Sequence, residues 1–591
     1  MKVSDYIAKR LKEHYSVEHF FMVSGGGAMH LNDSLGRIIS YIANHHEQAC
    51  AMAAEGYSRV NQKLAVVNVT TGPGGLNCLN GVFGQWTDSV PVLYISGQVK
   101  FSTTIASCPK LPLRQLGDQE VDIISVVKPL TKYAKMVTVP NEIKYHIDKA
   151  IYESTTGRFG PVWLDIPIDV QASMIEESEL IDFIYPKEIK YDFKMDLVIE
   201  KLNQAKRPLI IAGHGIRLSK QTQVFRKFIE KSRIPVVTTF NGFDLLEDSH
   251  PNYVGRIGTI GQRAGNFALQ NADMILCLGT RNNIRQASYN YENFAKNAAK
   301  VVVDVDEAEL LKPTIKADLA VNADLASFLP MLQEAINISS VEKKWLDYCF
   351  MVKEKFSFEN YKVGYLSSGS KIEPYHLVNE LSKLMDENTV VVMANGSACV
   401  CTFQTAVIKK GQRYILNSGN ASMGYDLPAS IGACLANGKK NTVCLAGDGS
   451  IMMNLQELQT IKHHNLPIKI FIINNDGYIS IKQTQNNFFE GRIIGASMQS
   501  GVSTPDFVNV AKAFGIKSIR LSDKDKITET IKEILALDEP FLCEVVVNSD
   551  YIFVPKLSSR KLDDGTMVSP SLEDMYPFLD RAEYRRNMVG L

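Results

Sequence analysis

The apolar residues in the last third of this chain form two uninterrupted runs separated by a segment of helical periodicity. Residues 442–446 and 467–473 are almost wholly apolar, which is typical of strands buried on both faces of a parallel sheet. Residues 454–465 place Leu455, Leu458 and Ile461 on one helical face. The pattern predicts a strand, a crossover helix and a second, parallel strand.

Polar residues follow both predicted strands at their carboxyl ends. Gly447-Asp448-Gly449-Ser450 comes after the first strand and Asn475 after the second. The carboxyl ends of parallel strands meet at one edge of a sheet, where ligands bind. A carboxylate and an amide oxygen suit Mg²⁺, and glycines let backbone N–H groups approach a phosphate. The segment predicts a site for Mg²⁺ and a diphosphate, although an ordinary crossover with turn-forming Asp and Asn would share the pattern.

The same alternation of apolar runs and helical segments continues through the whole chain. A chain of 591 residues is too long for a single core. The expected fold class is therefore α/β, with three doubly wound parallel-sheet domains over residues 1–185, 186–345 and 346–591. The first boundary falls in the charged, proline-containing stretch 184–188.

Composition narrows the range of partners. Lys and Arg total 64, and so do Asp and Glu, so neither nucleic acid nor an anionic membrane surface is expected as a partner. No apolar run is long enough to span a bilayer, and the first residues lack the apolar region of a signal peptide. The ten cysteines are scattered and mostly lie in apolar segments, so reduced thiols and a cytoplasmic location are expected.

Several motifs in order along the chain resemble one enzyme family. Gly-Asp-Gly at 447–449 is followed by the 24 residues 450–473 and then by Asn474-Asn475, a pattern similar to the thiamine diphosphate (ThDP) motif. Together with 46–48, 71–74, 95–98 and 160–167, it resembles the acetolactate synthase-like enzymes. The resemblance implies a pyrimidine-binding first domain, a Rossmann-like central domain and a diphosphate-binding third domain, and active sites at the interfaces of a homodimer or tetramer.

Glu47 is the catalytic residue that the resemblance implies. In the family this carboxylate hydrogen-bonds N1′ of the coenzyme's pyrimidine, which favours the tautomer whose 4′-nitrogen removes the thiazolium C2 proton. Taken alone, Glu47 would better suit a carboxylate that serves the dipole at a helix N-terminus, and its place at a strand-to-helix junction together with the 447–475 motif reverses that preference. His45 and His46 are interpreted as packing or hydrogen-bonding residues rather than metal ligands.

The resemblance also assigns residues to the coenzyme and its metal. Asp448, Asn475 and the backbone carbonyl of Gly477 are the implied Mg²⁺ ligands, and Met423 is implied to wedge between the coenzyme rings. Many relatives have Gly-Gln-His where this chain has Gly396-Ser397-Ala398, so an imidazole is missing there. The full set of implied coenzyme-binding residues is Pro73, Asn77, Gly396, Ser397, Ala421, Met423, Gly447, Asp448, Gly449, Ser450, Asn475, Gly477 and Tyr478.

The central domain is where the family binds FAD or keeps a vestige of that site. Gly213-x-Gly215 is half of a dinucleotide fingerprint. Residues 279–285 retain two arginines of the family segment Gly-Ala-Arg-Phe-Asp-Asp-Arg but neither its aromatic residue nor its two acids. FAD is expected on Gly213, Gly215, Arg281, Asp304 and Asp324, with an empty scaffold domain as the alternative.

The expected reaction is decarboxylation of pyruvate and transfer of the two-carbon unit to a carbonyl acceptor. Acetolactate synthases carry Met and Trp where this chain has Ser480 and Thr484. The pocket is therefore expected to accept something larger and more hydroxylated than pyruvate, such as a nucleotide-linked ketosugar, and the tail 569–577 resembles that subgroup. The candidate substrate residues are Gly26, Gln119, Arg285, Ser480 and Thr484.

Three alternatives remain open. One is an acetolactate synthase, in which Arg285 would hold the carboxylate of a second pyruvate. Another is a non-catalytic nucleotide-binding scaffold, against which intact Glu47, Asp448 and Asn475 argue. The last is a decarboxylase that releases aldehyde, although the paired histidines usual in its third domain have no clear counterpart.

Overall fold

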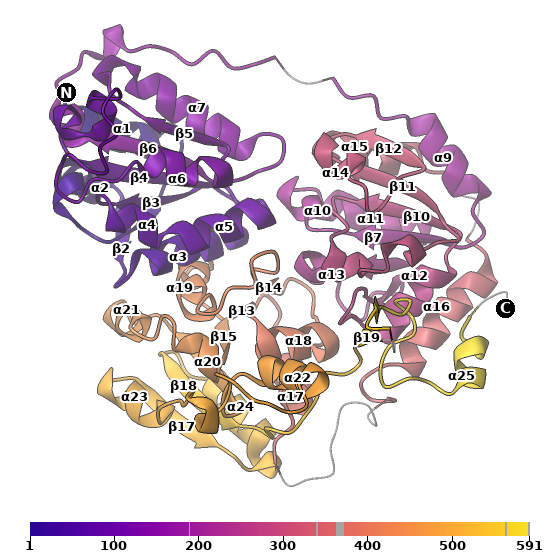
Figure 1. Ribbon diagram of the computed structural model, residues 1–591. Helices are drawn as coiled ribbons and strands as arrows, with labels where there is room; N and C mark the ends of the chain where they lie inside the picture. The colour runs from indigo at the N-terminus through magenta and orange to yellow at the C-terminus, as the bar shows by residue number, and fades with distance from the viewer. Residues whose placement is uncertain (188–189, 338–340, 362–370, 562–563, 589–591) are drawn as a thin grey trace.

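A computed structural model describes residues 1–187, 190–337, 341–361, 371–561 and 564–588 (Figure 1). They form three α/β units, each built on a six-stranded sheet in which every strand pairs in parallel with its neighbours. The doubly wound class predicted from the apolar pattern is confirmed, because helices flank each of the three sheets (Figure 1).

The first sheet has the strand order β2-β1-β3-β4-β6-β5. Every residue of β3 and β4 is buried, which explains the continuous apolar runs in these segments. The strands are β1 His19–Met22, β2 Ser40–Ala43, β3 Ala65–Val69, β4 Val92–Gln98, β5 Tyr133–Met136 and β6 Val162–Pro167. The helices are α1 Val3–Lys9, α2 Met29–Ile38, α3 Glu47–Asn61, α4 Pro73–Asn77, α5 Leu79–Asp88, α6 Ile123–Val127, α7 Ile143–Thr155 and α8 Ile168–Ala172.

The central sheet has the order β12-β11-β10-β7-β8-β9. Its strands are β7 Pro208–Ala212, β8 Val236–Thr238, β9 Tyr253–Arg256, β10 Met274–Leu278, β11 Ala299–Asp304 and β12 Leu319–Asn322. The helices around it are α9 Met195–Gln204, α10 Gly215–Leu218, α11 Thr222–Ser232, α12 Arg263–Asn271, α13 Ile284–Ala287, α14 Glu307–Leu311, α15 Leu325–Ala335 and α16 Lys343–Lys355.

The third sheet has the order β14-β13-β15-β16-β18-β17. Its strands are β13 Val390–Met393, β14 Arg413–Ile415, β15 Thr442–Gly447, β16 Ile468–Asn474, β17 Lys517–Leu521 and β18 Phe541–Val546. Its helices are α17 Pro374–Leu384, α18 Gly396–Thr405, α19 Asp426–Ala436, α20 Asp448–Ile451, α21 Glu457–His463, α22 Ile479–Phe488, α23 Phe507–Ala513 and α24 Ile527–Leu535.

The crossover helix between β15 and β16 is shorter than the predicted 454–465. Helix α21 begins only at Glu457. The Asn454 side chain donates to the Gly424 carbonyl at 2.8 Å instead of pointing along a helix surface. A tertiary contact therefore fixes residues that periodicity alone assigned to the helix.

The first and third units are joined by helices α3 and α19, which touch backbone to backbone. A β-carbon on Gly56 of α3 would lie 2.0 Å from the Ala429 carbonyl oxygen, and one on Gly432 of α19 would lie 1.8 Å from the Ala53 carbonyl oxygen. Only glycine permits so close an approach. The two sheets that carry the candidate residues are thus held at a fixed spacing.

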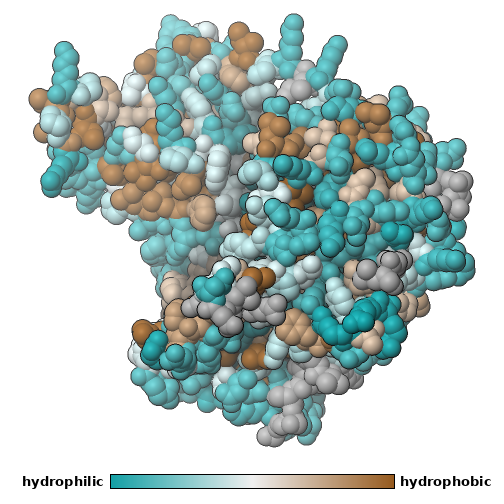
Figure 2. Space-filling model, turned by 45° about the vertical axis from the view of Figure 1, so that its right-hand side comes forward, coloured by the Kyte–Doolittle hydropathy of each residue, from teal (hydrophilic) through white to brown (hydrophobic). Residues whose placement is uncertain are grey.

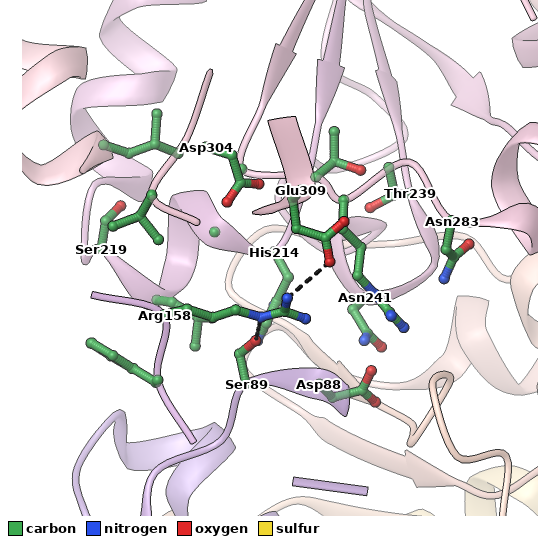
Figure 3. Close-up of a pocket in the computed structure, with 18 of the residues that line it drawn as sticks. Asp88, Ser89, Arg158, His214, Ser219, Thr239, Asn241, Asn283, Asp304 and Glu309 are labelled. Carbon is green, nitrogen blue, oxygen red and sulfur yellow. Dashed lines mark hydrogen bonds and ion pairs between the residues drawn. The ribbon is translucent and has the colours of Figure 1, made fainter. Parts of the chain in front are cut away.

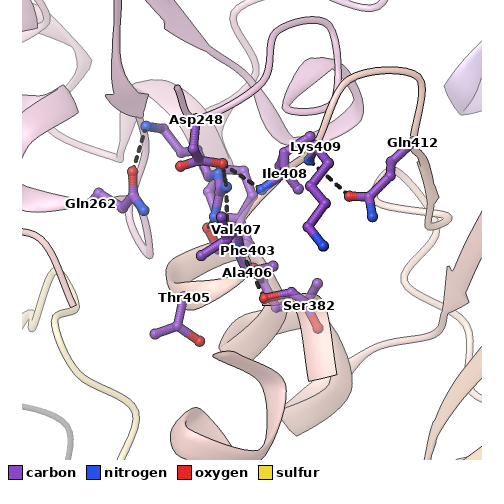
Figure 4. Close-up of polar contacts among 12 residues, drawn as sticks. Asp248, Gln262, Ser382, Phe403, Thr405, Ala406, Val407, Ile408, Lys409 and Gln412 are labelled. Carbon is purple, nitrogen blue, oxygen red and sulfur yellow. Dashed lines mark hydrogen bonds and ion pairs between the residues drawn. The ribbon is translucent and has the colours of Figure 1, made fainter. Parts of the chain in front are cut away.

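The central and third units meet at the C-terminal end of α18, where a fully buried guanidinium binds the helix carbonyls. Arg256 donates to the carbonyl oxygens of Phe403 at 2.9 Å and Ala406 at 2.6 Å. Asp248 accepts from Arg256 at 3.0 Å and from the backbone of Ile408 at 2.6 Å (Figure 4). The arginine thus satisfies orphan carbonyls that end the helix.

The C-terminal tail packs on the central unit. Leu572 and Leu579 join the core around β7 and β10, and Gln270 of α12 donates to Glu573 at 2.9 Å. The tail includes the short strands β19 Arg560–Lys561 and β20 Met567–Val568 and the helix α25 Arg581–Arg586. The predicted boundary at residue 346 falls inside α16, whose Trp345 and Cys349 belong to the central core. The boundary at 186 falls in a stretch without helix or strand, and residues 188–189 lie outside the described part.

The surface in Figure 2 is mostly hydrophilic, with hydrophobic patches concentrated on the first unit. None of the helices in the described ranges is both long and apolar enough to cross a membrane. All ten cysteines carry free thiols, and nine of them are buried.

Candidate active site

Asp448 lies at the carboxyl edge of the third sheet and is held by backbone donors. Its carboxylate accepts from the N–H groups of Gly449 at 2.9 Å, Gly477 at 2.9 Å and Asn475 at 3.2 Å. Burial raises its pKa to about 6, even though these three donors favour the ionised form. The structure therefore brings the three predicted metal-site residues together at the ends of β15 and β16.

The Asn475 side chain presents a free acceptor. Its amide nitrogen donates to Ser397 Oγ at 3.0 Å and lies 3.4 Å from the Tyr551 hydroxyl. Its Oδ1 atom is buried, and no donor among the described residues reaches it. A buried amide oxygen without a hydrogen-bond donor is costly unless a cation or a donor binds it.

Gly449 lies in a cradle formed by larger side chains. A β-carbon there would be 2.2 Å from the Tyr478 ring and 3.4 Å from the Met423 methyl carbon. Tyr478 and Met423 thus flank the Gly-Asp-Gly turn, as predicted for residues around one ligand. The Ser450 hydroxyl is engaged internally, because it donates to Asp426 at 2.6 Å and accepts from Gly424 N–H at 2.9 Å. Its hydroxyl hydrogen is therefore not free for a phosphate.

The predicted acceptor-side residues of the third unit lie on α22. Ser480 Oγ would be 3.8 Å from a β-carbon on Gly396, the first residue of α18. Thr484 is one turn further along, is exposed and donates to the Ser480 carbonyl at 3.0 Å. Ala421 adopts a positive φ of 54°, and its carbonyl accepts from Asn395 at 2.7 Å. Among the described residues, only the Ser480 side chain comes within 4 Å of a β-carbon on Gly396, so the space beside this glycine is open.

Glu47 is the first residue of α3 in the first unit. Its carboxylate accepts from Asn77 Nδ2 at 2.9 Å, at the end of α4. Helix α4 begins at Pro73, after Gly72 with a positive φ of 60°. Glu47 is only partly buried, and Pro73 and Asn77 are exposed in the single chain. The first unit alone therefore leaves this carboxylate accessible.

Gly26 and Gln119 lie at the same edge of the first sheet. A β-carbon on Gly72 would come 1.9 Å from the Gln119 carbonyl, which places residue 119 against the turn before Pro73. Gly27, next to Gly26, is similarly close to Thr71. Both candidate substrate residues thus lie next to the 71–73 turn.

Helix α5 and the loop 417–423 run side by side between the first and third units. Asn80 donates to the Ser422 hydroxyl at 2.8 Å near one end of the pair. At the other end, the Gly419 N–H lies 3.2 Å from an Asp88 oxygen. The loop that carries Ala421 and Met423 is therefore anchored on the helix that follows Pro73 and Asn77.

A large cavity opens between the first and central units (Figure 3). It has about 1060 Å³ of space, part of it open to solvent, and Gly215, Arg281, Arg285, Asp304 and Asp324 line it. The predicted Gly213 is adjacent: a β-carbon on it would be 2.2 Å from the Gly279 carbonyl. All five residues assigned to a dinucleotide thus gather around one cavity.

Some of the charged side chains around this cavity already form ion pairs with one another. Arg158 donates to Asp306 and Glu309, both at 2.8 Å, and to Ser89 at 3.1 Å, so it bridges two units (Figure 3). The Arg285 guanidinium lies over the Phe240 ring, 5.3 Å from its centre. Burial raises the pKa of Asp304 to about 6. Arg285, predicted for the substrate, lies in the central cavity.

Several residues at these sites were not anticipated from the sequence. His214 lines the cavity with both ring nitrogens buried and without a partner among the described residues, and burial holds its pKa well below 6.5. Arg158 and Asp88 also line the cavity, and Tyr551 lies beside Asn475. Only His214 had a local signal, since it stands between the two fingerprint glycines.

The donor set fits a hard divalent cation with a diphosphate. One carboxylate, one unsatisfied amide oxygen and a neighbouring backbone segment converge at Asp448, Asn475 and Gly477. The described residues contain no group of three or more His, Cys, Asp or Glu side chains able to hold a metal. A metal here would therefore depend on amide, backbone and phosphate oxygens together with the single carboxylate.

Comparison with known protein families agrees with the three-unit architecture. The model of the thiamine pyrophosphate enzyme N-terminal TPP binding domain matches residues 1–125. The central domain of the same enzymes matches 195–332, and their C-terminal TPP binding domain matches 394–545. The fold and its paired sheet edges therefore define a ThDP-dependent enzyme.

Acetolactate synthase subunits are similar over nearly the full chain. The large subunit from Lactococcus lactis is 32% identical, covering 98% of this chain and 98% of its own. The isozyme 2 large subunit from Escherichia coli is 30% identical over 90% of this chain and 93% of its own. A probable large subunit from Methanocaldococcus jannaschii is 29% identical over 93% and 92%. The chain belongs to the acetolactate synthase-like family of ThDP-dependent enzymes.

Proposed function

We propose that this enzyme is a carboligase that decarboxylates pyruvate and transfers the two-carbon unit to the carbonyl group of an acceptor. The observation that carries the proposal is that hydrogen-bonded polar residues gather at two sheet edges. One edge holds Glu47, and the other holds Asp448 and Asn475. Full-length similarity to acetolactate synthases supports pyruvate as the donor. The bound coenzyme supplies the electron sink that makes loss of CO₂ feasible.

Within this proposal, the two sheet edges bind different parts of the coenzyme. Asp448, Asn475 and the Gly477 carbonyl would hold Mg²⁺, and Gly447, Gly449, Ser397 and Tyr478 would surround the diphosphate. Glu47 would hydrogen-bond the pyrimidine ring and could hold a proton there, while Asn77 donates to the carboxylate at 2.9 Å and keeps it oriented. Met423, packed beside Gly449, would pack against the coenzyme rings. Pro73, Gly396, Ala421 and Ser450 would complete the surroundings through backbone or packing contacts.

A second copy of the chain completes the site in this proposal. Glu47 is only partly buried, and the apolar Leu76, next to its hydrogen-bond partner Asn77, is 37% exposed. A catalytic carboxylate works best where water is excluded, which one chain does not achieve at this edge. We therefore propose a homodimer or tetramer with its active sites between subunits, and a cytoplasmic location in keeping with the free thiols.

A second pyruvate is the acceptor that similarity to the acetolactate synthases favours. A larger acceptor, such as a nucleotide-linked ketosugar, is favoured by one specific observation. Ser480 lies beside Gly396, and Thr484 is exposed one turn later, so no bulky side chain of α22 fills this position. Gly26 and Gln119 at the opposite sheet edge would contact the acceptor.

Product analysis separates the two acceptors. The purified protein is incubated with Mg²⁺, ThDP and pyruvate, with and without a panel of ketosugar nucleotides, and products are identified by mass. Rapid acetolactate formation from pyruvate alone supports the first acceptor and refutes the second. A mass gain of one two-carbon unit on a sugar nucleotide, with little acetolactate, gives the reverse result. No CO₂ release under any condition would refute the carboligase itself.

We further propose that the central cavity binds FAD. Arg281 and Arg285 provide positive charge for a diphosphate, and Asp304 and Asp324 lie at strand ends where a ribose hydroxyl can donate. An absorption spectrum of the purified protein, and of the apoprotein reconstituted with FAD, tests this. Absence of any flavin uptake would leave the domain a scaffold.

A further inference from the structure

We propose that Tyr551 is a positioning residue of the metal and diphosphate site, acting through Ser397 and Asn475. The inference rests on the Mg²⁺ site of the proposed function. Tyr551 follows β18 and is 6% exposed. Its hydroxyl is hydrogen-bonded to Ser397 Oγ and lies 3.4 Å from Asn475 Nδ2. A phenol from a distant loop therefore touches both a predicted diphosphate residue and a predicted metal ligand.

The donors and acceptors of Tyr551, Ser397 and Asn475 can be assigned from their hydrogen bonds. Asn475 Nδ2 donates to Ser397 Oγ at 3.0 Å, so that side of the amide is occupied. The amide oxygen is then the free end, and no donor in the described ranges reaches it. When the Tyr551 hydroxyl donates to Ser397 Oγ, the serine hydrogen is released for a phosphate oxygen. The phenol thus orients both the metal-binding oxygen and the phosphate donor.

Tyr551 is fixed strongly enough to serve this purpose. Its backbone carbonyl accepts from Gln483 Nε2 of α22 at 3.2 Å, and its ring meets Phe553 edge-on at 5.7 Å. A phenol keeps its proton at neutral pH, so the hydroxyl remains a donor. Residues behind metal ligands commonly tune affinity by holding the ligand in one orientation.

The same unit contains a matched control. Tyr414 of β14 is also buried, at 3% exposure, but none of the described residues hydrogen-bonds its hydroxyl. Replacing either tyrosine by phenylalanine removes one hydroxyl from a buried ring. If Tyr551 were only a core residue, the two replacements would have the same effect on metal binding.

The test is calorimetric titration of MgCl₂ into the full-length protein saturated with ThDP, which requires no turnover. We expect Tyr551→Phe and Ser397→Ala each to raise the Mg²⁺ Kd by about 10- to 100-fold. The double variant should add little to either single variant, because both changes break one chain of hydrogen bonds. Tyr414→Phe should leave the Kd unchanged, and thermal unfolding of every variant verifies that it is folded.

The outcomes separate the inference from the function. An unchanged Kd in Tyr551→Phe, or an equal rise in Tyr414→Phe, overturns the positioning role while leaving the Mg²⁺ site intact. Additive effects of the two changes overturn the shared chain of hydrogen bonds. If the wild-type protein binds no Mg²⁺ with ThDP, the proposed metal site fails, and this inference fails with it.

Discussion

The backbone N–H of Gly419 lies 3.2 Å and 3.3 Å from the two carboxylate oxygens of Asp88. Asp88 ends helix α5 of the first unit, and Gly419 lies in the loop 417–423 that leads to Met423 in the third. Arg59 donates to the same carboxylate at 2.8 Å, and both side chains are almost fully buried. A single charged group thus anchors the loop 417–423 and lines the central cavity.

Replacing Asp88 should destabilise the whole protein. Asp88→Asn leaves the Arg59 guanidinium paired with Glu55 alone, which accepts from it at 2.9 Å, and loss of a hydrogen bond between charged groups costs about 1.5–3 kcal/mol. Urea unfolding measures the change. Asp33→Asn is the control, because Asp33 forms an exposed pair with Arg37 and should cost no more than about 1 kcal/mol. Equal losses in the two variants would contradict the anchoring role.

Glu47→Gln should retain the fold but lose coenzyme activation. Glutamine keeps the length of the side chain and can accept from Asn77, but it cannot take up a proton. We expect exchange of the coenzyme C2 proton to slow by about 10²- to 10⁴-fold. Quenched-flow NMR measures this exchange without substrate. Glu18→Gln, an exposed glutamate of the same unit, is the control. Wild-type exchange in Glu47→Gln would refute the assigned role.

Larger side chains on α22 should alter the choice of acceptor. Ser480→Met and Thr484→Trp introduce the bulk that acetolactate synthases carry at these positions. If the natural acceptor is a ketosugar nucleotide, the double variant should lose that reaction by at least about 10-fold, while pyruvate consumption continues. Competition between the two acceptors, read by mass, measures the ratio. Thr484→Val, which changes polarity but hardly volume, should leave the ratio near that of the wild type.

Arg281 should contribute to flavin binding in the cavity. A charge-assisted hydrogen bond to a phosphate contributes about 1.5–3 kcal/mol. Arg281→Met should therefore weaken FAD binding by roughly 10- to 100-fold. Titration of flavin fluorescence with apoprotein gives the affinity. Lys296→Met removes an exposed cation of the same unit that does not line the cavity. A loss in this control as large as in Arg281→Met would indicate a general charge effect.

Asp165 should make stability depend on pH. It is fully buried in β6, accepts from Ser96 at 2.5 Å and Gln98 at 3.1 Å, and burial raises its pKa to about 7. The unfolded carboxyl ionises near pH 4, so the folded state binds more protons between pH 4 and 7, and stability falls as pH rises through that window. Asp165→Asn removes this loss, which is on the order of 4 kcal/mol at neutral pH. Urea unfolding of both proteins at pH 5 and 8 measures it; parallel changes would contradict the shifted pKa.

The fold class and the sheet edge around Asp448 could be predicted because short stretches of the sequence determine both. Buried parallel strands need continuous apolar runs, and the sheet-edge rule brings Asp448 beside Asn475 from sequence order alone. Contacts between units join residues far apart in the sequence, so no local sequence pattern predicts them. Tyr551 lies 76 residues from Asn475, and Asp88 lies 331 residues from Gly419. The hydrogen bond from Ser450 likewise requires Asp426, and the hydrophobic pattern of the sequence does not predict that these two residues meet.

The buried guanidinium at the end of α18 also bears on how the chain is made. Arg256 binds the Ala406 carbonyl, which the ribosome adds 150 residues later. Until then, the carbonyl groups at the end of α18 that accept hydrogen bonds from Arg256 have not been synthesised. The edge strand β9, which carries Arg256, therefore reaches its final packing only when the following unit has emerged, and a fragment ending before residue 400 is expected to aggregate or be degraded rather than persist as a separate domain.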